Sequence, residues 1–496
     1  MLKKPVNHIT KMYRKASSKA IFLFYLIAAL TLRFPFFFRD YVDRDESTFI
    51  LMGQAWVDGF LPYTELWDLK PPVTFLFFGG LIYVFGKSFF TIRFAGTVVV
   101  ALTALLTFLL GKGLLGKKAG FWSGLLVVLL YSLFGSVQGV MSEHLSSCFF
   151  MAALFLLATK KGTLWTATAG VLLGLTIMTK LNMGYALVSI FLGMAWFGLK
   201  TEGIWPTLKK LVWIGCMVLL VVYATAIPYQ NEGLFHLWWQ SVFEAPLAYS
   251  GSKNHSVFDV LPLVLGITAL VGFGIWKKMV PWRSFEVALL LLATLGILFS
   301  FLQIGKVNGH YLLQVYPFLA LFLAMMVARS GISLKPWYKP VALLTLVLLP
   351  VETYLEYAHI LKAKNETGSF YNGEGFDVPR YFEAKDLSPQ RTLFLEYHIG
   401  YWIMDHRPPT KAATHPSNLV RDELFPFMLQ DRTTGIEELR FIMEDVQPDY
   451  VVTRKNRTAF DKEFVEANRY IESYLANAFK VIDTVDHAVI HHRIKK

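Results

Sequence analysis

The sequence is poor in cysteine and in charge, and both shortages exclude classes of protein. Its 496 residues include only two cysteines, Cys148 and Cys216, both in apolar segments, so we expect no disulfide-based extracellular fold. Charged residues make up 17% of the chain, against about 25% in typical soluble domains. No internal repeat of useful length is visible, which disfavours transporters built from duplicated halves. Hydrophobic residues make up 54%, so most of the chain is predicted to lie in lipid.

Basic residues give the chain a net charge of +12, but they are unevenly distributed. Residues 1–358 hold 29 lysines and arginines against 15 acidic residues, whereas residues 359–496 hold 19 against 21. The positive excess therefore belongs to the hydrophobic part of the chain, where basic residues are expected near the ends of membrane helices. Nucleic acid is not needed to explain the charge and is not predicted as a partner.

Eleven apolar segments could form membrane-spanning helices, each of which needs about 20 apolar residues. They lie at residues 20–38, 90–111, 119–138, 145–159, 163–179, 183–199, 211–228, 257–276, 285–304, 311–328 and 338–357. The first follows a basic segment that contains Lys3, Lys4, Lys11, Arg14, Lys15 and Lys19. It lacks a small-residue cleavage site, so we expect an uncleaved helix with a cytoplasmic N-terminus. The expected fold class is a polytopic α-helical membrane protein.

The positive-inside rule orients these segments consistently only if residues 71–86 form a short helix at the outer face and do not cross. The predicted inner loops then carry Lys112, Lys117, Lys118, Lys160, Lys161, Lys200, Lys209, Lys210, Lys277, Lys278, Arg283, Arg329, Lys335 and Lys339. The outer side would hold loop 39–89, a turn at Glu143-His144, loop 229–256 and the C-terminus. We therefore predict a multi-pass protein of the inner (plasma) membrane with an extracytoplasmic C-terminal domain.

The hydrophobic first part of the chain and its more polar last part differ in sequence pattern, and this difference predicts two domains. Residues 1–358 would form the transmembrane module. In residues 359–496, short β-like segments at 392–395, 450–452 and 480–482 alternate with polar helical patterns. We expect this second part to be a soluble α/β domain outside the membrane.

The first outer loop, residues 39–89, carries a high density of carboxylates at Asp40, Asp43, Asp45, Glu46, Asp58, Glu65 and Asp68. Such charges would keep a loop out of the bilayer whatever its function. Asp45-Glu46, however, opens a stretch with helical spacing, which places the pair at a helix start against the membrane surface. A carboxylate there can act as a general base towards a lipid-borne substrate. We therefore expect the active site in this loop.

The motifs of this loop carry a family resemblance. Asp45-Glu46, then GFLPY at residues 59–63 and WDLKPP at residues 67–72, resemble the polyprenyl-phosphate-sugar-dependent glycosyltransferases of the C-type (GT-C) fold. Protein O-mannosyltransferases and the lipid A aminoarabinose transferase belong to that group. Further matches follow in order at Ser142-Glu143, Gly174-Leu175-Thr176, Lys180, His310-Tyr311-Leu312-Leu313-Gln314 and Pro317. Tyr401-Trp402 and Arg407-Pro408-Pro409 are similar, more weakly, to the outer domains of bacterial members.

The resemblance implies a GT-C fold with about eleven transmembrane helices, interfacial helices in the first outer loop, and sugar transfer from a polyprenyl-phosphate donor. In this family an acidic residue of the first outer loop is the catalytic base, and the matching position is Asp45. Glu46 is the alternative base, or a helper that orients the acceptor. One carboxylate is enough for an inverting displacement, because the lipid phosphate leaves as an anion without being protonated.

Cationic and hydrogen-bonding groups are expected around the departing phosphate, because charges at that membrane depth are otherwise costly. The candidates for donor-phosphate binding are Lys70, Lys180, Lys306, His310 and Tyr311. The alternative for each lysine is an ordinary snorkelling side chain or a capped helix end. The alternative for Tyr311 is an aromatic residue of the membrane interface.

Acceptor or sugar binding is assigned to Asp68, Glu143 and His144, because GT-C enzymes often place a second acidic residue on the outer side. Glu143, His144 and His236 match no metal-ligand motif, and metal dependence differs between branches of the fold. The prediction therefore names no metal site and no certain cofactor, and it leaves a divalent metal open.

Two other classes of function fit parts of the pattern. A lipid-linked glycan flippase or transporter would also carry basic residues at lipid-phosphate depth, but its charges should line a path to both faces. A glycan ligase or polymerase would also act outside the membrane. The main prediction is a glycosyltransferase whose partners are a polyprenyl-phosphate sugar, membrane lipids, and an acceptor that is an envelope glycan, lipopolysaccharide or protein.

Overall fold

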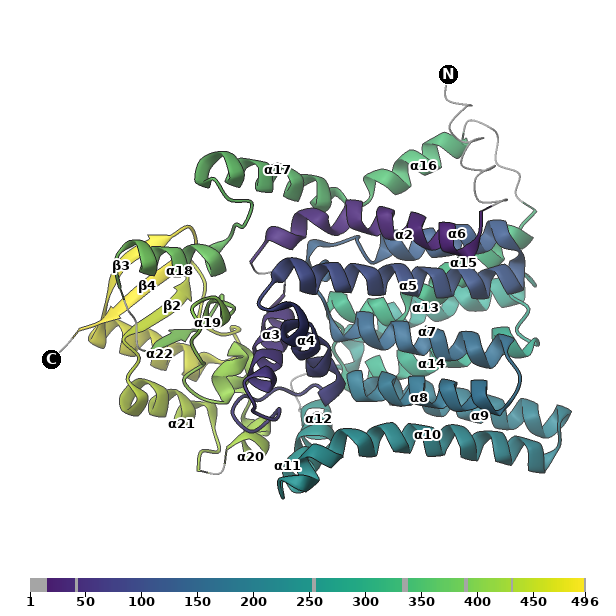
Figure 1. The fold of residues 1–496 in the computed structure, drawn as a ribbon, viewed down its shortest axis with the longest axis horizontal. Coiled ribbons are helices and arrows are strands. Elements are labelled where there is room, and N and C mark those ends of the chain that lie inside the picture. Colours follow the sequence, from purple (N-terminus) through teal and green to yellow (C-terminus); the bar gives the residue numbers. More distant parts are fainter. Residues whose placement is uncertain are drawn as a thin grey trace. The chain divides into compact units, whose positions relative to one another are not determined.

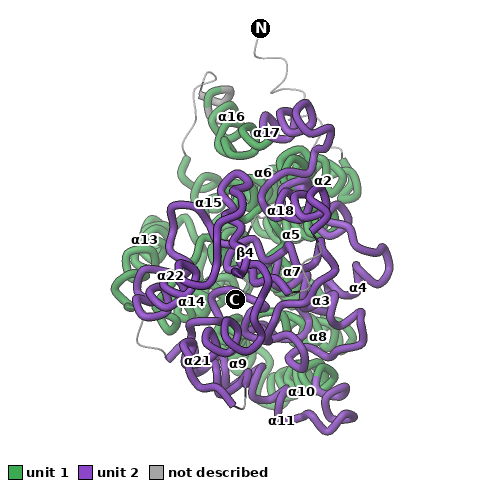
Figure 2. Tube along the Cα trace, turned by 90° about the vertical axis from the view of Figure 1, so that its left-hand side faces the viewer, with its two compact units in different colours: residues 1–36, 93–225, 253–356 green, residues 37–92, 226–252, 357–496 purple. Residues whose placement is uncertain are grey.

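The computed structural model describes residues 16–40, 43–251, 256–331, 338–387, 391–429 and 431–494. Some of the basic residues that orient the predicted spans lie outside the described residues, namely Lys3, Lys4, Lys11, Arg14, Lys15, Lys335 and the side chain of Lys339. The chain divides into two compact units (Figure 2). Unit 1 comprises residues 1–36, 93–225 and 253–356, and unit 2 comprises residues 37–92, 226–252 and 357–496.

Unit 1 is built of apolar helices that run alongside one another (Figure 1). They are α2 (Ser18–Arg33), most of α5 (Phe89–Leu115), α6 (Lys117–Leu130), α7 (Ser142–Thr159), α8 (Thr163–Thr179), α9 (Gly184–Thr201), most of α10 (Ile204–Asn231), α13 (Val257–Trp276), α14 (Phe285–Ile304), α15 (Tyr316–Arg329) and α16 (Tyr338–Leu348). Helix α7 packs on α8, α9 on α14, and α6 on both α2 and α15. Small residues allow close approach: a Cβ atom on Gly296 of α14 would lie 2.5 Å from the Cα of Ala186 in α9.

Within the described ranges, seven segments are long and apolar enough to cross a membrane. They are Ser18–Phe38, Phe89–Leu115, Ser142–Thr159, Leu181–Thr201, Ile204–Asn231, Val257–Trp276 and Phe285–Ile304. Each coincides with one of the predicted spans, so the prediction of a multi-pass helical membrane protein is confirmed. Helices α8 and α15 are apolar but shorter, and the count of eleven spans stays a prediction.

Not every predicted span forms one continuous α-helix. Segment 338–357 is divided between α16 and α17 (Val351–Thr367), because Pro350 has no backbone N–H to continue the helical hydrogen bonds. With 11 residues, α16 is about 16 Å long, well short of a bilayer core of about 30 Å. In segment 119–138, helix α6 already ends at Leu130.

A buried arginine satisfies the backbone where α6 ends. Arg33, the last residue of α2, has no exposed surface. Its guanidinium donates hydrogen bonds to the carbonyl oxygens of Tyr131, Val137, Gln138 and Gly139, at 2.7 to 3.2 Å. Carbonyl groups beyond a helix C-terminus have no intrahelical partner, and leaving them unpaired in an apolar interior is costly. Arg33 therefore lets the chain turn inside the helical unit.

Unit 2 holds the acidic loop. Its helices before the tail are α3 (Arg44–Val57), α4 (Pro72–Phe85), α11 (Phe235–Trp239) and α12 (Ala245–Ser250). The predicted helix start at Asp45-Glu46 is confirmed, and Asp43 caps α3 by accepting a hydrogen bond from the Asp45 N–H at 2.9 Å. Helices α3 and α4 pack through two glycines, because a Cβ atom on Gly53 would lie 2.7 Å from the backbone nitrogen of Gly79. The position of α4 at the membrane surface stays a prediction.

The tail forms a four-stranded mixed sheet with the order β1-β2-β4-β3. The strands are β1 (Thr392–Phe394), β2 (Tyr450–Arg454), β3 (Phe479–Val485) and β4 (Ala488–Arg493). β1 pairs parallel with β2, and the other pairs are antiparallel. The helices of the tail are α18 (Glu374–Ala384), α19 (Gly400–Ile403), α20 (Phe425–Met428), α21 (Gly435–Arg440) and α22 (Val465–Ala478). The three predicted β segments are thus confirmed, whereas β4 was not predicted.

Candidate active site

Asp45 lies in the first turn of α3 between two basic side chains. Its Oδ2 is 3.2 Å from Lys70 Nζ, and its Oδ1 is 3.4 Å from His415 Nε2. The Asp45 side chain is 17% exposed, so a substrate can reach it. Glu46, the alternative base, is only 1% exposed. Of the two carboxylates, Asp45 is therefore the better placed to take a proton from an acceptor hydroxyl.

Lys70 is held in place by the loop that precedes α4. Its Nζ is also 3.9 Å from Asp68 Oδ1 and lies over the Phe49 ring, 5.3 Å from the ring centroid. Asp68 is buried, and its Oδ1 accepts a hydrogen bond from the Lys70 N–H at 3.1 Å. The Tyr63 hydroxyl donates to the Lys70 carbonyl at 2.7 Å. The structure thus brings Asp45, Lys70 and Asp68 together, and the roles assigned to them stay predictions.

The C-terminal tail adds residues that the sequence analysis missed. Besides His415, the tail provides Glu396, which accepts a hydrogen bond from the Arg44 guanidinium at 2.5 Å. It also provides His398, whose Nε2 is 3.0 Å from the Thr48 hydroxyl. Burial, with the Arg44 guanidinium nearby, holds the pKa of His398 well below its usual range. No motif in the tail marks these residues, because their proximity to α3 arises only from folding.

A second group of predicted residues meets in unit 1 around Glu143. The Glu143 side chain is fully buried, and its Oε1 lies 2.5 Å from Lys180 Nζ and 3.9 Å from His310 Nε2. The Ser142 hydroxyl donates to Glu143 Oε2 at 3.1 Å. Lys180 Nζ also lies over the Tyr311 ring, 4.5 Å from its centroid. Glu143 therefore contacts candidates for donor-phosphate binding, whereas the sequence groups it with the residues predicted to bind acceptor or sugar.

The turn predicted around Glu143-His144 lies directly before these residues, because both belong to the first turn of α7. Its location on the outer side stays a prediction. His144 is fully buried, its Nδ1 accepts a hydrogen bond from the Met141 N–H at 3.1 Å, and its ring packs edge-on against Tyr131. Lys306 is half-buried in the segment after α14. Across the part of the chain that the structure describes, Lys306 forms no ion pair. The roles predicted for His144 and Lys306 remain predictions.

The predicted site residues therefore form two groups, one in each unit. Asp45, Glu46, Lys70 and Asp68 belong to unit 2, while the candidates Lys180, Lys306, His310, Tyr311, Glu143 and His144 belong to unit 1. Among the described residues, no group of three or more His, Cys, Asp or Glu side chains is arranged to hold a metal ion.

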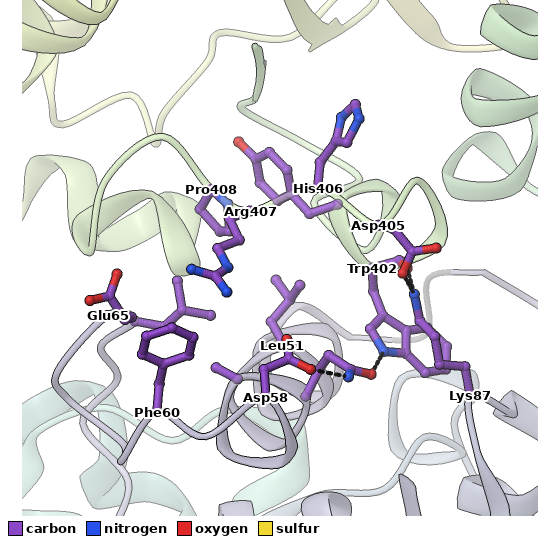
Figure 3. A pocket seen from close by; sticks show the side chains of 14 residues that line it. Leu51, Asp58, Phe60, Glu65, Lys87, Trp402, Asp405, His406, Arg407 and Pro408 are labelled. Atoms are coloured by element: carbon purple, nitrogen blue, oxygen red, sulfur yellow. Dashed lines mark hydrogen bonds and ion pairs between the residues drawn. The ribbon is translucent and has the colours of Figure 1, made fainter. Parts of the chain in front are cut away.

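Unit 2 also contains a cleft beside α3 (Figure 3). One cavity of about 180 Å³ is lined by the C-terminal half of α3 and residues 401–402 and 405–408. A neighbouring cavity of about 300 Å³ shares the lining residues Glu65, Leu66, Arg407 and Pro408. Figure 3 shows the Arg407 guanidinium over the Phe60 ring, 4.4 Å from its centroid. Asp45 and Lys70 do not line either cavity, so the cleft is separate from the proposed base.

Comparison with known families supports the resemblance seen in the sequence. Residues 69–229 match the sequence model of a family described as dolichyl-phosphate-mannose-protein mannosyltransferase. This range includes Lys70, Glu143 and Lys180 but covers less than half of the chain. A search among curated proteins gave no significant match. The predicted resemblance to this group of proteins is confirmed by the family match.

Two solved structures are similar to most of the chain. ArnT from Cupriavidus metallidurans bound to undecaprenyl phosphate has a TM-score of 0.61 and 16% identity, covering 97% of this chain and 99% of that one. The archaeal oligosaccharyltransferase AglB from Archaeoglobus fulgidus, in complex with an inhibitory peptide and a dolichol-phosphate, has a TM-score of 0.52 and 12% identity, covering 89% and 70%. At such low identity the similarity establishes the fold, which is the expected GT-C fold.

Proposed function

We propose that this chain, a membrane glycosyltransferase of the GT-C fold, transfers a sugar from a polyprenyl-phosphate donor to a cell-envelope acceptor, with inversion at the anomeric carbon. The observation that carries the proposal is the partly exposed carboxylate of Asp45, held 3.2 Å from Lys70 within the motifs that resemble GT-C enzymes. The acceptor is a glycan, lipopolysaccharide or protein.

A single base is sufficient for this reaction. The acceptor hydroxyl attacks the anomeric carbon as its proton moves to Asp45, and the bond from that carbon to the phosphate oxygen breaks on the opposite face. The polyprenyl phosphate departs as an anion, so no acid has to protonate it. Lys70, whose ammonium lies between Asp45 and Asp68, is the cation of unit 2 that we assign to the phosphate. Glu46, which follows Asp45 in the chain and is buried, would help to orient the acceptor.

The group in unit 1 is proposed to contact the donor phosphate through Lys180, His310 and Tyr311. Glu143 balances the charge of Lys180 before the lipid phosphate binds, and this pairing makes a buried lysine tolerable in an apolar environment. The solved structure of ArnT with undecaprenyl phosphate supports a donor of this lipid class. Lys306 keeps the same proposed role, and Asp68, Glu143 and His144 keep their proposed roles in binding acceptor or sugar.

The proposed orientation follows from the positive-inside rule. Eleven spans, with segment 338–357 crossing as α16 followed by the first turns of α17, place the N-terminus in the cytoplasm and residues 359–496 on the extracytoplasmic face of the inner membrane. Helix α4 then lies at the outer surface. This orientation puts Asp45 on the side where the acceptor is available. Seven of the proposed spans are long and apolar enough in the described residues, which supports the arrangement.

The proposal is tested with the full-length protein in lipid vesicles that contain total lipid-linked sugars extracted from the host membranes. Release of free polyprenyl phosphate and transfer of labelled sugar are measured together. Asp45→Asn keeps the side-chain size but removes the proton acceptor, so both rates should fall by roughly 100-fold or more. Asp259→Asn, at an exposed aspartate in the first turn of α13, is the matched control and should behave as the wild type.

Two outcomes would contradict the proposal. Normal transfer by folded Asp45→Asn protein would reject Asp45 as the base and direct attention to Glu46 or Asp68. Movement of intact lipid-linked sugar across the vesicle membrane, without cleavage of the sugar–phosphate bond, would indicate a flippase.

A further inference from the structure

The tail places a histidine against the proposed base. His415 lies between α19 and α20, and its Nε2 is 3.4 Å from Asp45 Oδ1. We infer that His415 is a positioning residue that orients the Asp45 carboxylate as a neutral hydrogen-bond donor, so that the tail completes the active site. The inference rests on the proposed function of Asp45 as base. His415 lies outside the matched family range, residues 69–229, and outside the sequence motifs.

The position of the proton on the His415 ring is set by the local backbone. The Ser417 N–H donates to His415 Nδ1 at 3.1 Å, an arrangement in which His415 caps the short helix Pro416–Val420. A ring nitrogen that accepts a hydrogen bond carries no proton, so the neutral ring holds its proton on Nε2, the atom that faces Asp45. If Nδ1 also carried a proton, its N–H would face the Ser417 N–H. The hydrogen bond that caps the short helix Pro416–Val420 would then be lost. His415 therefore donates to Asp45 and does not take up the acceptor proton.

Lys70 and His415 approach different oxygens of the same carboxylate. Lys70 Nζ is 3.2 Å from Oδ2, and His415 Nε2 is 3.4 Å from Oδ1. The second distance exceeds the roughly 2.9 Å typical of a formed N–H···O bond, and such contacts in substrate-free sites commonly tighten when substrate binds. A carboxylate oriented from both sides needs less reorganisation before proton transfer.

The segment that carries His415 is firmly tied to the acidic loop. The Thr48 hydroxyl donates to the Thr414 carbonyl at 3.3 Å, and the Trp67 N–H donates to the Thr414 hydroxyl at 3.4 Å. The His415 side chain is only 7% exposed. Its ring centroid is 5.9 Å from that of His398. Because the preceding residue is tied to the acidic loop and the ring itself is buried, its direction towards Asp45 is determined by the fold and not by a free side-chain rotation.

Two substitutions of His415 test the donor directly, with polyprenyl phosphate release as the readout. His415→Leu removes the donor, so the turnover number should fall by roughly 10- to 100-fold while the KM for donor changes little. His415→Gln offers an amide N–H near the position of Nε2 and should recover most of the loss. His487→Leu, at an exposed tail histidine paired with Glu374, is the control and should have wild-type turnover.

A double variant separates positioning from a general structural defect. If His415 acts through Asp45, then His415→Leu should not lower the residual rate of Asp45→Asn any further. A structural defect would lower the rate by the same factor in the wild-type and the Asp45→Asn backgrounds. Thermal unfolding of every variant is recorded as well. Wild-type turnover in His415→Leu, or equal losses in the two backgrounds, would overturn the inference. A wild-type protein that releases no polyprenyl phosphate would instead reject the proposed function.

Discussion

Replacing Lys180 by methionine tests the buried ion pair of unit 1. The side chains of Lys180 and Glu143 are 7% and 0% exposed, and their charged atoms are 2.5 Å apart. Methionine keeps most of the apolar stem but removes the charge. The Glu143 carboxylate, which also lies 3.1 Å from the Ser142 hydroxyl and 3.9 Å from His310 Nε2, then loses its lysine. Because a buried carboxylate that loses its cation is poorly solvated, we expect a large loss of stability.

The free energy of unfolding is expected to fall by about 3–5 kcal/mol, the range for removing one partner of a buried ion pair. The exposed pair of Lys210 and Glu202, with side chains 40% and 45% exposed and charged atoms 3.1 Å apart, provides a matched control. Lys210→Met should cost only about 0–1 kcal/mol. Unfolding of the detergent-solubilised proteins by heat, followed by circular dichroism, measures both. A Lys180→Met protein as stable as Lys210→Met would show that buried Glu143 does not depend on Lys180 for its stability.

The double variant Lys180→Met with Glu143→Gln separates stability from function. Removing both charges should restore most of the stability, since no unpaired buried charge remains. If Lys180 also contacts the donor phosphate, the folded double variant should still bind donor roughly 10- to 100-fold more weakly. Normal donor affinity in a stable double variant would show that the pair is structural only.

Three more predictions concern a buried arginine, the orientation and a buried histidine. Arg33→Met should lower the free energy of unfolding by more than about 2 kcal/mol, because it leaves buried carbonyl groups without donors; an unchanged unfolding temperature would contradict this. A C-terminal reporter that is active only in the cytoplasm should be silent, and a bright signal would reverse the topology. Burial lowers the pKa of His398, so below about pH 6.5 the unfolded chain binds a proton that the folded chain does not, and stability falls as the pH falls. In denaturation at pH 7 and pH 5, His398→Gln should lose less stability than the wild type, and equal losses would count against the assignment.

The fold class was predictable because its cause is local. A helix that crosses lipid must be apolar along its whole length, so each span is recorded in consecutive residues. The helix start at Asp45 was predictable for a similar reason, since capping depends on residues within one turn. The break between α16 and α17 at Pro350 was also predictable, because proline interrupts a helix. It was missed because the apolar residues around Pro350 suggested one continuous span.

The multi-pass helical architecture, the acidic loop with Asp45 and Lys70, and the GT-C resemblance all follow from short stretches of consecutive residues. Which charged residues meet depends instead on how the chain folds. The pairing of Glu143 with Lys180, and the approach of His415 to Asp45, join residues that are far apart along the chain. Such contacts depend on how helices and tail pack together, and packing is the sum of many small non-local interactions that no short motif records.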